Sequence, residues 1–159
     1  MKMLSICLLA AALPLGVQSA NAQTAAKPKP KGAARTITLT GNDQMKYDKT
    51  ELTAKPGETI RVVLKSVGTM AKAVMGHNFV LLKLDADVAE FNTAAFAARA
   101  TDFIPEDKKD SIIAHTALAG PGETVEVTFK VPTKAGNYNF LCSFPGHYAL
   151  GMRGKLLVK

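Results

Sequence analysis

The sequence predicts an all-β domain of about eight short strands, arranged as a Greek-key sandwich or barrel. Apolar and polar residues alternate as they do in strands with one buried face, along residues 36–40, 60–65 and 125–130. Further short apolar segments, bounded by Gly and Pro, lie at 77–83, 111–116, 138–142 and 152–159. The composition, with 47% hydrophobic and 21% charged residues, excludes a disordered chain, a collagen and a coiled coil.

Two of the strands are introduced by the same turn sequence, Pro-Gly-Glu-Thr. Pro56 and Pro121 preset φ for the first turn position, and Gly57 and Gly122 supply a positive φ at the next one. The flanking residues do not match, so the shared turn does not indicate a domain repeat.

One short helix is expected as an insertion between strands, at residues 87–100. Asp87 and Glu90 form a D-x-x-E capping box at its start. Its apolar side chains fall on one face, namely those of Val88, Phe91, Ala95 and Ala98. We interpret this face as a packing surface for the sheet and not as a cofactor site.

The N-terminal residues 1–22 have the pattern of a secretory signal peptide. Lys2 precedes an apolar stretch, and Ala20-Asn21-Ala22 ends it before Gln23. The stretch contains Pro14 and is too short to cross a bilayer comfortably, so no stable membrane insertion is expected. Export to the periplasm is therefore predicted.

Residues 23–34 are rich in Lys, Pro and Ala and lack apolar periodicity, which predicts a flexible tail. The remaining residues 35–159 are enough for one domain, which we expect to be a monomer. The net charge of +7 falls to +3 from residue 32 onward, with 16 basic and 13 acidic residues. Such a mild excess gives no support for nucleic-acid binding.

No enzyme motif is evident. The sequence has no G-x-S-x-G elbow, no phosphate-binding Gly loop and no acidic cluster typical of a calcium site. Its carboxylates lie in polar loops or at the helix start, where solvation and capping explain them. We therefore do not expect catalysis.

A set of sulfur and imidazole side chains near the C-terminus is more informative. Cleavage of the signal peptide leaves Cys142 as a lone thiol, which an exported protein must bury or bind to a metal. His147 and Met152 follow it in one loop between two expected strands, and His77 begins another strand. Two imidazoles, a thiolate and a thioether suit copper that cycles between Cu(I) and Cu(II). Tetrahedral zinc could use the same atoms, although a Met ligand would be atypical.

Four motifs make the chain resemble the azurins, within the cupredoxin family of blue copper proteins. They are G-N-D-Q-M at 41–45, M-G-H-N at 75–78, I-A-H-T at 113–116 and C-S-F-P-G-H at 142–147. The resemblance implies an eight-stranded Greek-key β-sandwich with a helical flap, one type 1 copper ion and a soluble one-electron carrier. Such a carrier would exchange electrons with redox partners such as a c-type cytochrome or a copper oxidoreductase.

The resemblance also implies roles for individual residues. His77, Cys142 and His147 would bind the copper, Met152 would be its axial ligand, and the Gly76 carbonyl would be a long contact opposite. Asn78 and Ser143 would hold the ligand loops by hydrogen bonds. His115 has no soft ligand nearby in the sequence and is expected on the strand surface.

The chain departs from the azurin pattern at several points. Four residues separate His147 from Met152, as in plastocyanin and pseudoazurin, whereas azurins have three. The azurin disulfide is absent. The azurin Trp is Phe79 here, and the His of the azurin pH switch is Ser66.

Two other functions remain open. A periplasmic copper carrier or chaperone would use similar ligands but usually exposes Met-rich or His-rich clusters. A copper enzyme needs a second His-rich centre, and only His115 is spare. For the electron carrier we expect an exposed apolar patch around the edge of His147, including Leu150, Met45, Met70 and Met75.

Overall fold

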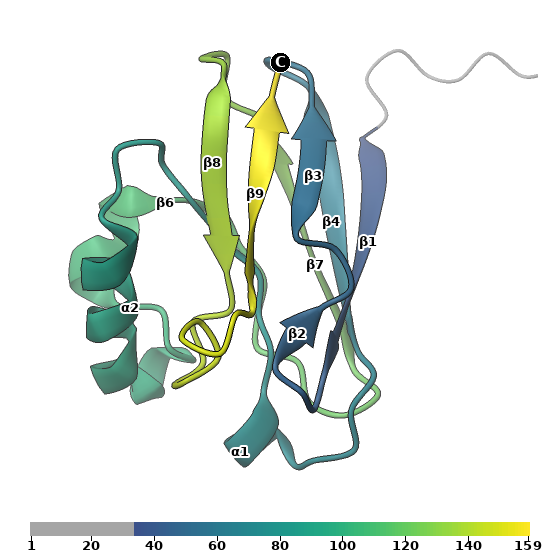
Figure 1. The fold of residues 1–159 in the computed structure, drawn as a ribbon, viewed down its shortest axis with the longest axis vertical. Coiled ribbons are helices and arrows are strands. Elements are labelled where there is room, and N and C mark those ends of the chain that lie inside the picture. The colour runs from purple at the N-terminus through teal and green to yellow at the C-terminus, as the bar shows by residue number, and fades with distance from the viewer. Residues whose placement is uncertain (1–33) are drawn as a thin grey trace, which may run out of the picture.

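The computed structural model describes residues 34–159, which form a two-layer β-sandwich (Figure 1). One sheet has the strand order β2-β1-β4-β7, with bounds Lys46–Tyr47, Arg35–Asn42, Thr59–Ser66 and Thr124–Lys130. The other has the order β3-β9-β8-β5-β6, with bounds Glu51–Ala54, Arg153–Val158, Gly136–Leu141, Val80–Leu82 and Ile112–His115. The predicted all-β sandwich is confirmed. The expected signal peptide and nearly all of the tail lie outside the described residues.

The alternating segments became strands with one buried face. In β1, Ile37 and Leu39 are buried, while Thr36 and Thr38 are exposed and Thr40 is half-buried. The two Pro-Gly turns also formed as predicted, with φ of 72° at Gly57 and 73° at Gly122. In both turns an amide bonds back three residues to a carbonyl, that of Lys55 and that of Gly120.

Two strands were not anticipated. The two-residue β2 pairs with the end of β1, and seven of the nine strands in residues 34–159 lie at the segments that the sequence pattern indicated. The four-residue β3 has a weak pattern of its own and is held by parallel pairing with β9. The strand expected at 77–83 is shorter, because before β5 only an isolated bridge joins His77 to Ala119.

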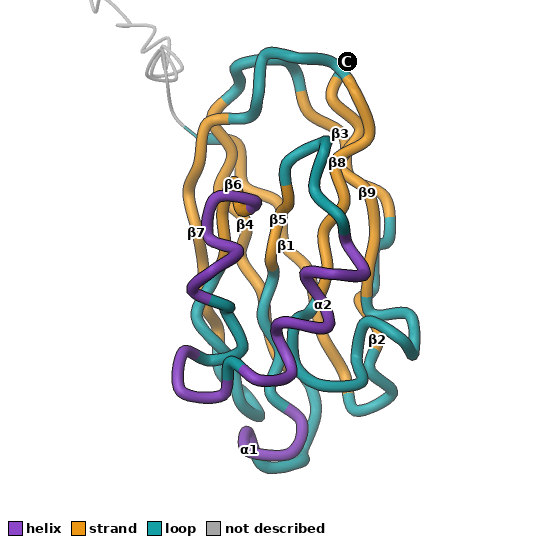
Figure 2. The backbone as a smooth tube through the Cα atoms, turned by 90° about the vertical axis from the view of Figure 1, so that its left-hand side faces the viewer, coloured by secondary structure: helices purple, strands orange, loops and turns teal. Residues whose placement is uncertain are grey.

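The expected helix is α2, Val88–Ala97, and its start is capped by Asp87, whose side chain accepts a hydrogen bond of 2.9 Å from Glu90 N. The Glu90 carboxylate pairs with Lys108, so the capping box is only half formed. Phe91 and Ala95 are buried. Phe91 packs in a second small core with Val80, Leu82, Ile104 and Leu141. Figure 2 shows α2 lying against the five-stranded sheet.

The expectation of a single helix was incomplete. A short helix α1, Lys72–Met75, precedes β5, and two 3₁₀ segments, Arg99–Thr101 and Glu106–Ser111, follow α2. Such one-turn and 3₁₀ pieces have too few residues for a recognisable periodicity. Among residues 34–159, no helix is long and apolar enough to cross a membrane.

The loops that carry the candidate ligands gather at one end of the sandwich. Figure 1 places α1, the β1–β2 turn and the segment between β8 and β9 at this end, opposite the C-terminus. Beneath these loops, Phe140 packs against Phe79 and Tyr47 with ring centroids 5.3 and 5.6 Å apart. The site therefore rests on a rigid aromatic layer of the core.

Candidate metal centre

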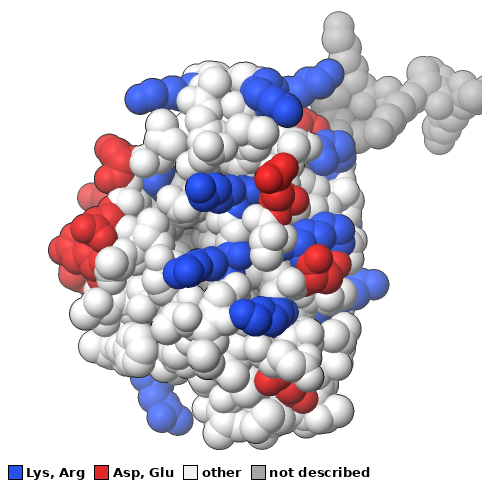
Figure 3. Space-filling model, viewed as in Figure 1, with Lys and Arg blue, Asp and Glu red and all other residues white. Residues whose placement is uncertain are grey.

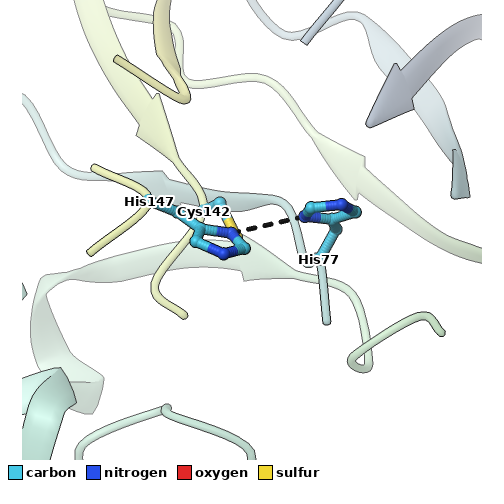
Figure 4. A group of neighbouring side chains, drawn as sticks. All are labelled: His77, Cys142 and His147. Atoms are coloured by element: carbon cyan, nitrogen blue, oxygen red, sulfur yellow. Dashed lines mark hydrogen bonds between the residues drawn. The ribbon is translucent and has the colours of Figure 1, made fainter. Parts of the chain in front are cut away.

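Three side chains from distant parts of the chain converge at this end. The ligand atoms of His77, Cys142 and His147 all lie within 4.8 Å of one another (Figure 4). The Nδ1 atoms of the two imidazoles are 3.3 Å apart, and Cys142 Sγ is 3.4 Å from His147 Nδ1. The three residues are at most 1% exposed. Within residues 34–159 they form the one group of three such side chains close enough to hold an ion.

The backbone of the β8–β9 loop fixes two of these residues. Cys142 directly follows β8, and Met152 directly precedes β9. Cys142 N donates to Met152 O at 3.0 Å, and Met152 N donates to His147 O at 2.9 Å. Cys142, His147 and Met152 are thus tied together at the neck of one loop, as the spacing predicted.

His77 is held from the opposite side of the site. Its backbone N and O bond to Ala119 at 2.9 and 2.7 Å. The next residue, Asn78, donates to Ser143 Oγ at 2.8 Å and accepts from Ser143 N at 2.9 Å. This reciprocal pair joins the His77 segment to the Cys142 loop, which is the role that the resemblance implied.

Met152 and Gly76 lie beside this cluster. Met152 is fully buried. Its methyl carbon and the His77 ring both pack against Gly41, so a Cβ atom at residue 41 would lie only 2.8 Å from the Met152 methyl carbon. Cys142 Sγ is 3.9 Å from Gly76 O. A side chain on Gly76 would clash with Leu118 and with the Lys72 carbonyl, both 2.8 Å away. Glycine at 41 and 76 therefore permits the close packing around the site.

Burial dominates the electrostatics of the cluster. It raises the pKa of the Cys142 thiol to about 12, although the backbone amides of Asn78 and Phe144 oppose the shift. Burial, and then the charge of His77, lower the pKa of His147 to about 4. Burial also lowers the pKa of His77, against the raising effects of Asp43 and of the Asn42 backbone. Without a metal, both imidazoles are therefore neutral at pH 7 and the thiol keeps its proton.

The cluster fits a copper ion. Two neutral imidazoles have free lone pairs, a thiol can lose its proton to a metal, and a buried thioether stands beside them. His77 Nε2 is buried and makes no hydrogen bond of good geometry within the described residues, although the Asn42 backbone is close enough to affect its pKa. A single thiol with a thioether is unlike the Cys- and His-rich sets of structural zinc sites.

Comparison with known proteins identifies the family. The model of the copper-binding proteins of the plastocyanin/azurin family matches residues 33–159. The chain belongs to this family. Azurin-1 of Alcaligenes xylosoxydans xylosoxydans is 42% identical over 123 residues, which cover 76% of this chain and 94% of that protein. Auracyanin-A of Chloroflexus aurantiacus is 42% identical over 118 residues, or 73% of this chain and 68% of that protein.

Solved structures of this family have the same fold. Dithionite-reduced auracyanin from Roseiflexus castenholzii matches 80% of this chain and 99% of its own, with 39% identity and a TM-score of 0.70. Auracyanin A of Chloroflexus aurantiacus, described as a "blue" copper protein, gives 41% identity and a TM-score of 0.67 over 78% of this chain and 98% of its own. With its His-Cys-His cluster, this member of the family is a blue copper electron carrier whose cofactor is one type 1 copper ion.

The apolar surface at this end differs in part from the expectation. Met75 is only 8% exposed and His147 only 1%, because α1 turns Met75 inward and the loops close over the ring. The expectation that these two residues face the solvent was therefore wrong. Leu150 and Met70 are exposed as expected, and Val67 and Val74 add to the apolar surface of the same loops. His115 is exposed on β6, as predicted.

Two supporting contacts were missed from the sequence. The Tyr47 hydroxyl donates to the Asn78 carbonyl inside the core, and Lys46 Nζ donates to the Leu150 carbonyl in the ligand loop. Both residues follow Met45, whose positive backbone φ of 56° is unusual for a residue other than glycine. No composition signal marks that turn, although the neighbouring G-N-D-Q-M motif does point to the segment.

Proposed function

We propose that His77 and His147 bind the copper ion of this electron carrier through Nδ1, and Cys142 through Sγ. The Met152 thioether would be a weaker fourth ligand, and the Gly76 carbonyl would be a more distant contact. The observation that carries this proposal is the convergence of three buried donors from separate loops at one end of the sandwich.

Copper supplies a reversible one-electron change between Cu(II) and Cu(I). The chain keeps the donors in one arrangement for both states, since Cys142, His147 and Met152 are linked through backbone hydrogen bonds. The Asn78–Ser143 pair fixes the position of His77 relative to that loop. Buried, close-packed ligands rearrange little, which favours fast electron transfer.

We further propose a monomer of three parts: a signal peptide at 1–22, a Lys/Pro/Ala-rich tail at 23–34 and the copper domain at 35–159. The charge and hydropathy pattern of the first residues supports cleavage and a periplasmic location. The partners are redox proteins such as a c-type cytochrome or a copper oxidoreductase. The protein transforms no substrate of its own, and it binds neither nucleic acid nor a membrane stably.

A copper carrier or chaperone is the competing function. The burial of all three donors argues against it, because delivery requires ligands that a recipient can reach. Adding Cu(II) to the copper-free protein tests both functions, and we expect saturation at one equivalent with an intense visible band. Copper that resists a Cu(I) chelator through repeated redox cycles supports the electron carrier, and copper lost at the first reduction supports delivery. A folded protein that stays colourless contradicts the proposed ligands.

Copper binding should release one proton per ion at pH 7. The proton comes from Cys142, whose thiol pKa of about 12 keeps it protonated, while the lowered imidazole pKa values leave both rings neutral. Because both imidazole pKa values lie below the ordinary value of about 6.5, the apparent affinity should rise about tenfold per pH unit from pH 6.5 upward, as long as the pH stays below the thiol pKa of about 12. A weakly buffered indicator titration measures the release, and Cys142→Ser should abolish it. Release of no proton from the unmodified protein would contradict the ligand set.

Met152→Leu should retain copper and colour but raise the reduction potential. The thioether favours Cu(II), and Leu removes it while keeping an apolar side chain of similar size. We expect a rise of at least about 59 mV, a tenfold shift toward Cu(I). Voltammetry of this variant and of Met70→Leu, an exposed control at the same end, measures the effect. Loss of all copper would show that Met152 is not a weak axial ligand.

The reduction potential should be nearly independent of pH between about 6 and 8, where an ordinary His would titrate. Ser66 is buried, and its hydroxyl does not ionise in this range, so no proton uptake at this position can couple to the copper charge. Potentials measured by voltammetry should stay flat in the unmodified protein, and Ser66→His should introduce a sigmoidal step. A step already present in the unmodified protein that survives His115→Gln would refute this expectation.

A further inference from the structure

A positively charged hollow lies on the outer face of the five-stranded sheet, beside the ligand loop. Its volume is about 180 Å³, and it is lined by Tyr148, Arg153 and Lys155 together with Val88 of α2 and residues Asn139, Phe140 and Gly154 of the paired strands. Arg153 and Lys155 point outward from alternate positions of β9. Figure 3 shows Lys and Arg side chains gathered around a depression on this face. We call Lys46, Tyr148, Arg153 and Lys155 the basic surface.

The cations of this surface, Lys46, Arg153 and Lys155, are free of direct ion pairs within the described part of the chain. Glu51 lies opposite Lys155 in the β3–β9 register but does not pair with it. The largest group of acidic residues lies along α2 and the segments around it, and Figure 3 shows this group at the left edge of the same face, with single acidic residues also lying among the cations. An acidic partner would thus be attracted to the basic surface and repelled from that edge.

The basic surface is directly connected to the metal centre. Tyr148 follows the proposed ligand His147 in the chain, and Arg153 follows Met152. The Arg153 guanidinium stacks over the Tyr148 ring, 4.7 Å from its centroid, and Lys46 bonds to the loop carbonyl of Leu150. An electron leaving here would pass from the His147 ring through one peptide unit to the half-exposed Tyr148.

We propose that the basic surface is a second contact site of this electron carrier, at which an acidic protein partner docks. Carboxylates of the partner lie between Arg153 and Lys155 and against Lys46, and its redox centre approaches Tyr148. The hollow fits a single carboxylate side chain and is too small for a cofactor, for which pockets of roughly 300 Å³ or more are typical. The docking is brief and sensitive to salt, unlike contacts through the apolar loops. The proposal rests on the electron-carrier function and the ligand set above.

Binding of hexaglutamate to the reduced Cu(I) protein tests the docking without an electron-transfer readout. At low salt, amide NMR shifts should map to β9 and to residues 148–151, and the affinity should fall about fivefold in Arg153→Gln/Lys155→Gln. The control Lys65→Gln/Lys130→Gln removes the same charge from the other sheet and should change the affinity less than about twofold. Arg153→Lys keeps the charge and should bind normally. Equal losses in both double variants would overturn the proposal.

Electron transfer from the same surface is tested with charged small oxidants. The reduced protein gives one electron to hexacyanoferrate(III), forming hexacyanoferrate(II), and this rate should fall about fivefold in Arg153→Gln/Lys155→Gln at low salt. The rate with the cationic tris(phenanthroline)cobalt(III) should not fall, and hexaglutamate should inhibit only the anionic oxidant. If hexaglutamate inhibits the reaction with neither oxidant, the proposed docking of an acidic protein is overturned, because the basic surface would then bind small anions only. The blue band of each variant reports separately on the proposed ligands.

Discussion

Cys142→Ser should abolish the intense visible band of the oxidised protein completely. The band requires donation of charge from a thiolate into Cu(II), and Cys142 is the one cysteine of residues 34–159. Its Sγ lies 3.4 Å from His147 Nδ1 within the donor cluster, and the buried Met152 sulfur beside it is a neutral thioether that cannot replace a thiolate. Visible absorption together with metal content measures the change, and we also expect the copper affinity to fall at least a hundredfold, about 2.7 kcal/mol.

Ser143→Ala is the matched control for this substitution. It alters the neighbouring buried residue and removes the hydroxyl that Asn78 binds, but it leaves the thiol in place. The control should therefore keep the blue band, even though it loses one hydrogen bond worth about 1 kcal/mol. A Cys142→Ser protein that remains blue would exclude Cys142 as the thiolate ligand.

The sequence was most informative where one local pattern determines one local structure. Alternation predicted β1, β4 and β7, and the Pro-Gly pairs predicted positive φ at Gly57 and Gly122. The sequence pattern did not predict β3, because these four residues have a weak pattern and become a strand only through pairing with β9. Strand pairing between distant segments is not encoded in either segment alone.

The same distinction applies to the metal centre. Cys142, His147 and Met152 lie in one loop, so their spacing alone indicated a shared site. The exposure of a particular side chain depends on how separate loops meet, which explains why Met75 was wrongly expected at the surface while Leu150 was not. The Lys46 contact with the ligand loop likewise depends on a turn at Met45 that the composition does not mark.

Leu150 makes the apolar loops testable as the surface for electron exchange between two copies of the protein. Its side chain is 54% exposed at the end that carries the metal centre. Two copies that meet through these loops must desolvate them, and a charge at Leu150 makes this costly. We expect Leu150→Glu to slow electron self-exchange at least tenfold, about 1.4 kcal/mol, with a nearly unchanged copper spectrum.

The sign of the introduced charge separates desolvation from repulsion. The domain from residue 32 onward carries +3, so Glu lowers the repulsion between two copies and Lys raises it. If desolvation controls the encounter, Leu150→Glu and Leu150→Lys both slow self-exchange, measured by NMR line broadening in mixtures of Cu(I) and Cu(II) protein. Leu84→Glu, a partly exposed control that contacts Gly136 at the opposite end, should leave the rate unchanged. Faster exchange with Glu and slower exchange with Lys would instead mean that net charge governs the encounter, and the apolar loops would then not be the exchange surface.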